Sequence, residues 1–119
     1  MKHTSAFNAL KALGQSHRLH VFRVLVRAGK QGLSVGAIAA ATGLPGATLN
    51  NHLNILRNAG LIDDERRGRS IICHANYALM NALLGYLTEN CCADDPAGGA
   101  CKEAVTTCDT TSASRKTRA

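Results

Sequence analysis

The segment from Ala47 to Asn58 constrains the fold more than any other part of the sequence. Its apolar residues Leu49, Leu53 and Leu56 recur at i, i+4 and i+7, which is the spacing of one face of an α-helix. Most of the remaining side chains are polar and can both donate and accept hydrogen bonds. A helix of this kind buries one stripe and presents the rest to a polar partner.

A second, shorter helix is predicted just upstream, from Val35 to about Thr42, with Ser34 as its N-cap. The connection Gly43-Leu44-Pro45-Gly46 has room for a tight turn only. Two short helices joined by a tight glycine-containing turn, the second with a polar outer face, are the helix-turn-helix arrangement. We therefore predict that the second helix lies in the major groove of DNA.

The rest of the pattern predicts a mainly α fold with a small β-hairpin, a winged helix-turn-helix. Scaffold helices are expected over Ser5–Leu13 and from Ser16, as the N-cap, to about Ala28. The alternation over Ser70–Ala75 predicts a strand with Ile71 and Cys73 facing inward, in a hairpin with Gly68 at its tip.

A last helix is expected from Tyr77, and it is apolar around most of its circumference. A domain this small can cover such a helix on one side, so we expect a second copy of the chain to cover the other and form a homodimer. Beyond Glu89 the composition shifts to Gly, Ala, Asp, Thr and Ser. The expected organisation is a DNA-binding and dimerisation domain over residues 1–90 and a flexible cysteine-containing tail over 91–119.

Charge and composition indicate the kind of partner and the cellular compartment of the protein. The chain has 14 Lys and Arg against 8 Asp and Glu, a net charge of +6, which suits a polyanion such as nucleic acid, although a merely soluble basic protein is the alternative. No stretch is long and apolar enough for a membrane span, and a signal-peptide pattern is absent, so we expect a cytoplasmic protein without a membrane partner. Five cysteines in a reducing compartment argue against a disulfide framework.

The residues from Ala47 to Ile62, followed by Arg66-Arg67-Gly68-Arg69, resemble the ArsR/SmtB family of metal-responsive repressors. The stretch from Ala12 to Leu19 also looks like that family's entry into its second helix, so the similarity covers roughly residues 5 to 90. The resemblance implies a symmetric dimer on a palindromic operator, with recognition helices in successive major grooves and wings near the minor groove. It also implies release of DNA when metal binds.

The expected DNA contacts follow from side-chain chemistry. Asn pairs bidentately with adenine, Thr and Ala can contact phosphate or a thymine methyl, and hairpin arginines can meet phosphates or enter a minor groove. His52 is expected to pack between helices or contact phosphate, and a solvated helix face and a solvated turn are the alternatives. The predicted DNA-binding residues are Ala47, Thr48, Asn50, Asn51, His52, Asn54, Arg66, Arg67 and Arg69.

The cysteines near the C-terminal end suggest a site for a soft ion. Cys91 and Cys92 are adjacent donors, Cys101 can return through a Pro- and Gly-containing turn as the third, and Cys108 is the reserve. Thiolates select soft ions, and a trivalent arsenic or antimony centre takes three of them. We expect Cys73 to be a core residue rather than a ligand.

Zinc is disfavoured because it normally takes four closed N or S ligands. The Asp and His ligands of the zinc site that the resemblance implies are missing from Tyr77–Leu87, and the Cys-x-Cys arsenic site of other members is missing from Val35–Thr42. Family members with a Cys-Cys pair at the end of the C-terminal helix are arsenite sensors, and the chain resembles that type.

The sequence therefore predicts a transcriptional repressor, not an enzyme, with As(III) or Sb(III) as effector and no organic cofactor. One alternative is a thiol-based redox-switch repressor whose tail cysteines form disulfides under oxidant. A thiol-dependent arsenate reductase is less well supported, because neither a phosphate-cradling loop with a reactive cysteine nor a Cys-x-x-Cys pair is present.

Overall fold

The computed structural model describes residues 1–96 of the chain. One compact unit comprises Met1–Leu83, and a second begins at Leu84, within the last helix. The elements in chain order are α1 (His3–Leu13), α2 (Ser16–Ala28), the 3-10 helix η1 (Gly29–Gln31), β1 (Leu33–Ser34), α3 (Val35–Thr42), α4 (Gly46–Asn58), β2 (Ile62–Arg67), β3 (Ser70–Ala75) and α5 (Tyr77–Thr88).

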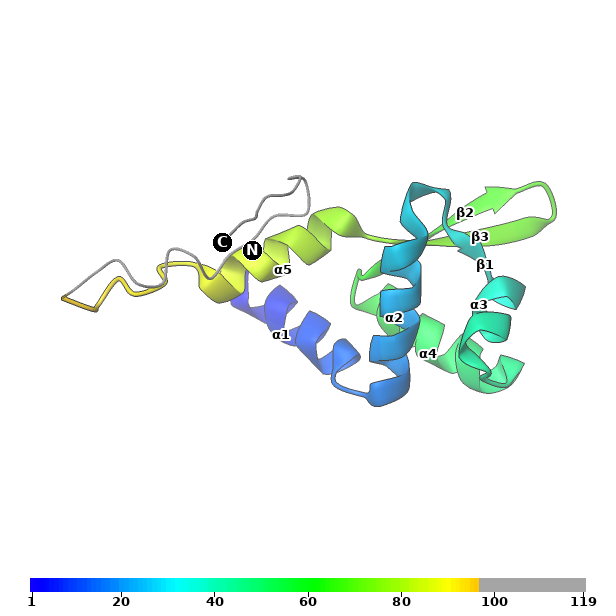
Figure 1. Cartoon of the computed structure of the whole chain (residues 1–119), viewed down its shortest axis with the longest axis horizontal. Helices are drawn as coiled ribbons and strands as arrows, with labels where there is room; N and C mark the ends of the chain where they lie inside the picture. Colours follow the sequence, from blue (N-terminus) through cyan, green and yellow to red (C-terminus); the bar gives the residue numbers. More distant parts are fainter. Residues whose placement is uncertain (97–119) are drawn as a thin grey trace, which may run out of the picture. The chain divides into compact units, whose positions relative to one another are not determined.

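The core of the first unit forms around α2, which packs against α1, α3 and α4 (Figure 1). Val21 and Leu25 of α2 are fully buried, as is Ile38 of α3. Helix α1 contributes only small side chains to this core, and their size lets the helix backbones approach closely. They are Ala6, Ala9 and Ala12.

A three-stranded antiparallel sheet has the order β1-β3-β2, with Leu33 opposite Cys73 and Arg67 opposite Ser70. Strands β2 and β3 form the predicted hairpin, which projects from the helices (Figure 1) and has Gly68 in its turn. The short strand β1 was not predicted. Gly32 permits it, because a Cβ at this position would stand 2.5 Å from the carbonyl oxygen of Cys73.

Local capping confirms most of the predicted boundaries and corrects one. Ser34 Oγ accepts a hydrogen bond from the Ala37 amide at 3.1 Å, as expected for the N-cap of α3. For α2 the prediction was wrong: Gln15, not Ser16, is the N-cap, and its Oε1 accepts from the Arg18 amide at 3.0 Å. The longer Gln side chain reaches the orphan amide from one position upstream.

Strand β3 differs from its predicted facing at one residue. Cys73 is fully buried, as expected, but Ile71 is 40% exposed. Strict alternation would place both inward. Ile71 pairs with Arg66 near the tip of the hairpin, and the hairpin there extends past the helices, so neither face of the strand meets a core.

Helix α5 begins where the sequence predicted, at Tyr77, and is anchored to α2 at that end. The Tyr77 hydroxyl lies 3.3 Å from the Leu25 carbonyl oxygen and 3.1 Å from that of Val26, and can donate to either. Asn76 Oδ1 accepts from the Leu79 amide at 3.1 Å and so caps the helix. Across residues 1–96, none of the helices is long and apolar enough to cross a membrane.

Stability should depend on the buried stripe of α4 and hardly on the exposed apolar residue of the hairpin. We expect Leu53→Ala to lower the free energy of unfolding by about 2–5 kcal/mol, because it leaves a cavity. Ile71→Ala should cost less than about 1 kcal/mol, since Ile71 is already 40% exposed and lies outside the core. Urea unfolding at one fixed protein concentration measures both, and equal losses would contradict the packing described.

Candidate nucleic-acid interface and thiol pair

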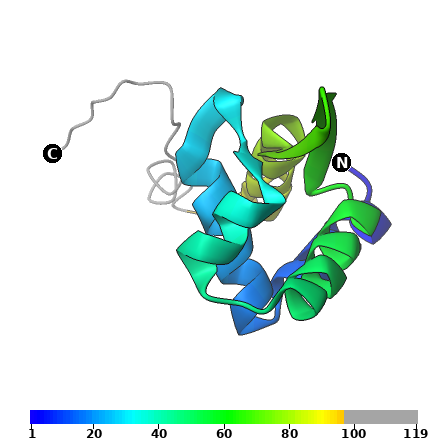
Figure 2. The same cartoon turned by 90° about the vertical axis from the view of Figure 1, so that its right-hand side faces the viewer.

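The outward face of α4 collects the polar residues that the sequence analysis selected. Helices α3 and α4 are joined by Gly43-Leu44-Pro45, where Gly43 has φ +74 and donates its amide to the Ala39 carbonyl oxygen at 2.8 Å. This left-handed C-cap ends α3 and turns the chain sharply into α4 (Figure 2). Exposed on α4 are Ala47, Thr48, Asn50, Asn51 and Asn54.

The opposite face of α4 anchors the helix. Leu49, Leu53 and Leu56 are each 0% exposed, and α4 packs against α1, α2 and β2. A helix held along its length by one stripe cannot rotate without exposing that stripe to water. The polar face is therefore fixed in its outward direction.

His52 differs from the other candidates because it is buried, at 7% exposed. Its ring lies 5.9 Å from that of His17 on α2, and its Nδ1 has no hydrogen-bond partner within residues 1–96. Burial, with the nearby charges of Arg18 and His17, lowers the pKa of His52 and favours the neutral imidazole. This environment favours the helix-packing role over a phosphate contact.

The hairpin carries its three candidate arginines on exposed positions around the turn. Arg67 donates to Glu65 Oε1 at 3.0 Å, and His74 Nε2 lies 2.8 Å from the same oxygen. These hydrogen bonds, from Arg67 first and His74 second, lower the pKa of Glu65. In the described part of the chain, Arg66 and Arg69 form no ion pair.

A cluster of three residues joins the end of α4 to the hairpin. Arg57 Nε lies 2.7 Å from Asp64 Oδ2 on β2, and the Cys73 thiol on β3 donates to Asp64 Oδ1 at 3.4 Å. Burial, followed by the effect of Asp64, raises the pKa of Cys73 to about 11. The sulfur is thus a protonated, shielded thiol at neutral pH, which confirms the predicted core role. The sequence analysis did not anticipate this cluster.

The predicted thiol pair lies directly after α5. Cys91 is an exposed thiol, and its Sγ stands 3.5 Å from that of Cys92. Cys92 is itself disulfide-bonded, though not to Cys91. Its backbone has φ 63, a left-handed value that is uncommon for a non-glycine residue and marks a sharp turn. Cys101 and the reserve donor Cys108 lie outside the described residues.

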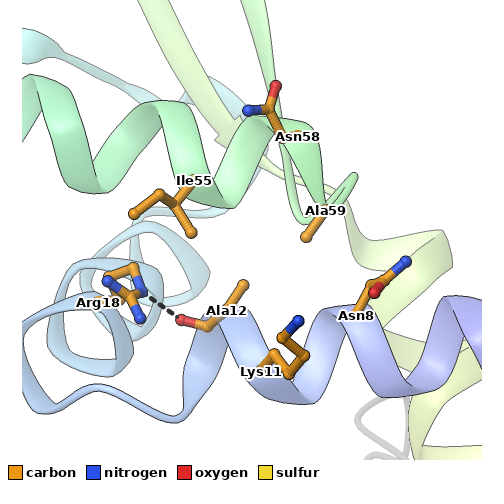
Figure 3. A pocket seen from close by; sticks show the side chains of 7 residues that line it. All are labelled: Asn8, Lys11, Ala12, Arg18, Ile55, Asn58 and Ala59. Carbon is orange, nitrogen blue, oxygen red and sulfur yellow. Dashed lines mark hydrogen bonds between the residues drawn. The ribbon is translucent and has the colours of Figure 1, made fainter.

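A separate groove of about 320 Å³ lies where α1, the start of α2 and the end of α4 meet (Figure 3). Its cations are already engaged within the protein: Arg18 Nε donates to the Ala12 carbonyl oxygen at 2.7 Å, and Lys11 Nζ stands 5.2 Å from the centre of the Phe7 ring. We interpret the groove as a packing seam between helices.

Comparisons with known proteins agree with this geometry. Residues 13–65, which run from the end of α1 into β2, match the family model described as a helix-turn-helix domain. The HTH-type transcriptional regulator YgaV of Escherichia coli (strain K12) is 31% identical over 83 residues, covering 70% of this chain and 82% of that protein.

Solved structures show the same fold. The ArsR-like transcriptional regulator from Rhodococcus sp. RHA1 superposes with a TM-score of 0.66 at 23% identity, over 77% of this chain and 83% of that one. The homodimeric winged helix-turn-helix DNA-binding domain of Mb0332 from Mycobacterium bovis gives a TM-score of 0.56 at 27% identity, over 73% and 81%. These relatives are DNA-binding regulators rather than enzymes. A hairpin wing beside a recognition helix, together with this similarity, shows that the chain belongs to the ArsR family of winged helix-turn-helix transcriptional regulators.

Proposed function

We propose that this chain is a repressor that binds operator DNA as a homodimer and releases it when As(III) or Sb(III) binds the thiolates of Cys91, Cys92 and Cys101. The DNA-binding part of this proposal is supported by helix α4, which exposes a polar face to solvent while its opposite face, a stripe of leucines, is fully buried. Such a helix fits the major groove, and the exposed Arg66 and Arg69 of the wing can contact phosphates nearby.

Dimer formation is supported by apolar side chains left in solvent. On α5, Leu84 is 46% exposed and Leu87 55%; on α1, Phe7 is 53% exposed and Leu10 43%. Large apolar residues grouped on a helix face in this way usually mark an interaction surface. A second copy of the chain is the simplest cover, and the related Mb0332 domain is described as homodimeric.

The effector part rests on sulfur chemistry and spacing. Two metal–sulfur bonds of about 2.3 Å can span at most about 4.6 Å, so sulfurs 3.5 Å apart can be bridged by one atom. Residues 1–96 contain no group of three or more His, Cys, Asp or Glu able to hold a metal ion, so a third donor must come from beyond them, as Cys101 would. Binding requires Cys92 in its reduced form.

Release of DNA needs only a small change in the dimer. A tenfold to hundredfold loss of DNA affinity corresponds to about 1.4–2.7 kcal/mol. Helix α5 joins the recognition domain to the cysteines without a break in the chain. Effector binding after the end of α5 can therefore alter subunit packing and with it the spacing of the two recognition helices. Because thiolates bind the effector, the response should weaken as the pH falls.

A redox-switch repressor is the second candidate, and the disulfide at Cys92 favours it. In that case oxidation of the tail thiols, rather than metalloid binding, would change the affinity for DNA. The two mechanisms separate cleanly: release by arsenite under reductant supports metalloid sensing, and release by peroxide alone supports the redox switch.

If α4 and the wing bind DNA as proposed, substitutions in the two elements should lower DNA affinity in different ways. Asn50→Ala should lower affinity for the operator more than for unrelated DNA, because a base contact is removed. Arg69→Ala should weaken binding to both and reduce the slope of log affinity against log salt by about 1. Fluorescence anisotropy at several salt concentrations measures both effects. Asn58→Ala, an exposed change at the end of α4, is the control and should bind as the wild type does.

The dimer surface predicts that Leu87→Lys weakens self-association at least about tenfold, because burying a charge opposes the apolar contact. The monomer should remain folded, since Leu87 is exposed in a single chain. Asn81→Lys adds the same charge at an exposed polar position of α5 and is the matched control. Sedimentation velocity over a concentration series measures the dissociation constant of the dimer. A dimer unaffected by Leu87→Lys would show that this face of α5 is not the dimer interface.

The thiol pair predicts separable effects on binding and release. Cys91→Ser and Cys92→Ser should keep wild-type operator affinity and lose release by arsenite, measured by anisotropy under reductant. Cys73→Ala should keep the arsenite response, because its raised pKa and burial remove Cys73 as a ligand at neutral pH. If arsenite still released operator DNA fully from both the Cys91→Ser and the Cys92→Ser variant, the proposed metalloid site would be wrong.

A further inference from the structure

Arg57, near the C-terminal end of α4, is held on three sides. Its Nε lies 2.7 Å from Asp64 Oδ2, and its NH2 group lies 3.9 Å from the Cys73 sulfur. The remaining NH1 group donates to Asn54 Oδ1 at 2.7 Å. Asn54 sits one helical turn earlier, on the exposed face of α4. Arg57 therefore links the base of the wing to a side chain that faces outward.

This contact fixes which end of the Asn54 carboxamide faces DNA. A guanidinium has only hydrogen-bond donors, so Arg57 must meet the carboxamide oxygen and not the nitrogen. The amide nitrogen of Asn54 then lies on the side of the carboxamide away from Arg57, where it can donate to a partner. Asn50 and Asn51 are also exposed on α4 but have no such contact among the described residues, so their carboxamides can present either end.

The difference matters because bases differ in their major-groove edges. Bidentate pairing of Asn with adenine uses the amide nitrogen on N7 and the amide oxygen on the exocyclic amino group. The Asn54 oxygen keeps a second lone pair, but its bond to the guanidinium turns the amide nitrogen away from Arg57, so donation is the better-placed role of this side chain. Guanine offers two acceptors, N7 and O6, whereas cytosine offers an amino donor.

We propose that Arg57 is a positioning residue that presents Asn54 to DNA as a hydrogen-bond donor, so that Asn54 selects a base edge rich in acceptors, guanine above adenine. The proposal rests on the proposed placement of α4 in the major groove. Asp64 and Cys73 serve it indirectly, because they hold the guanidinium in the orientation from which NH1 reaches Asn54. In this respect the wing helps to set the specificity of the recognition helix.

The test is selection of operators from a randomised DNA library by the full chain, followed by affinity measurements on the selected sites. Asn54→Ala identifies the base pair whose preference depends on Asn54. At that position the wild type should favour guanine over adenine, and Arg57→Met should shift the preference toward adenine by about three- to tenfold, the effect of one hydrogen bond gained. The shift should vanish when Arg57→Met is combined with Asn54→Ala. Asn58→Ala is the control and should keep the wild-type preference.

Loss of the Asp64 partner could destabilise Arg57→Met, so Arg57→Lys provides a second variant. A lysine ammonium keeps a positive charge beside Asp64 but lacks the planar fork that spans Asp64 and Asn54 together. We expect Arg57→Lys to retain the melting temperature within a few degrees and to show the same shift toward adenine.

The outcomes separate this inference from the proposed function. An operator-binding wild type whose base preference is unchanged by both Arg57 variants would overturn the role of Arg57 and leave the repressor proposal standing. The same holds if Asn54→Ala weakens binding to every sequence equally, since Asn54 would then contact phosphate. A wild-type chain without any sequence-specific binding would overturn both.

Discussion

Burial of the leucine stripe on α4 is the constraint on which the rest of this structure depends. Leu49, Leu53 and Leu56 are all removed from solvent, and each contributes about 1.5–3 kcal/mol relative to an exposed position. The same contacts that stabilise the domain also set the rotation of α4 about its axis. The same buried leucines therefore determine both the stability of the domain and the direction in which the exposed polar face of α4 points.

The wing is attached to that helix by charge rather than by apolar packing alone. Protein surfaces that contact phosphates are rich in Lys and Arg, yet strand β2 contains Asp63, Asp64 and Glu65. Two of these carboxylates have cationic partners: Asp64 pairs with Arg57, and Glu65 with Arg67 and His74. Such pairs offset the repulsion that bare acids would exert on phosphates. The Asp64–Arg57 pair also ties the hairpin to α4, so that these two elements are positioned together, whereas the pairs of Glu65 lie within the hairpin.

The cysteines show how environment separates residues of one chemical type. Cys73 lies in the core, bonded to Asp64 and with a pKa raised to about 11, where it acts as a small apolar side chain. Cys91 is exposed and Cys92 half-buried, in a turn after α5, with their sulfurs 3.5 Å apart. The same residue type is therefore a buried, protonated thiol at position 73 and a solvent-accessible thiol at position 91.

The sequence by itself determined the structural features that depend on residues close together along the chain. The period of the leucines placed α4, Ser34 capped α3, and the alternation of Ser70–Ala75 located β3, because helix, cap and strand signals act over a few residues. Only the tertiary structure decided the strand Leu33–Ser34, the exposure of Ile71, the burial of His52 and the contacts of Arg57 with Asp64 and Cys73. Several of these depend on pairings of residues up to 40 positions apart, and the others on where the helices end against the sheet. No local pattern records such contacts, since they exist only once the chain has folded back on itself.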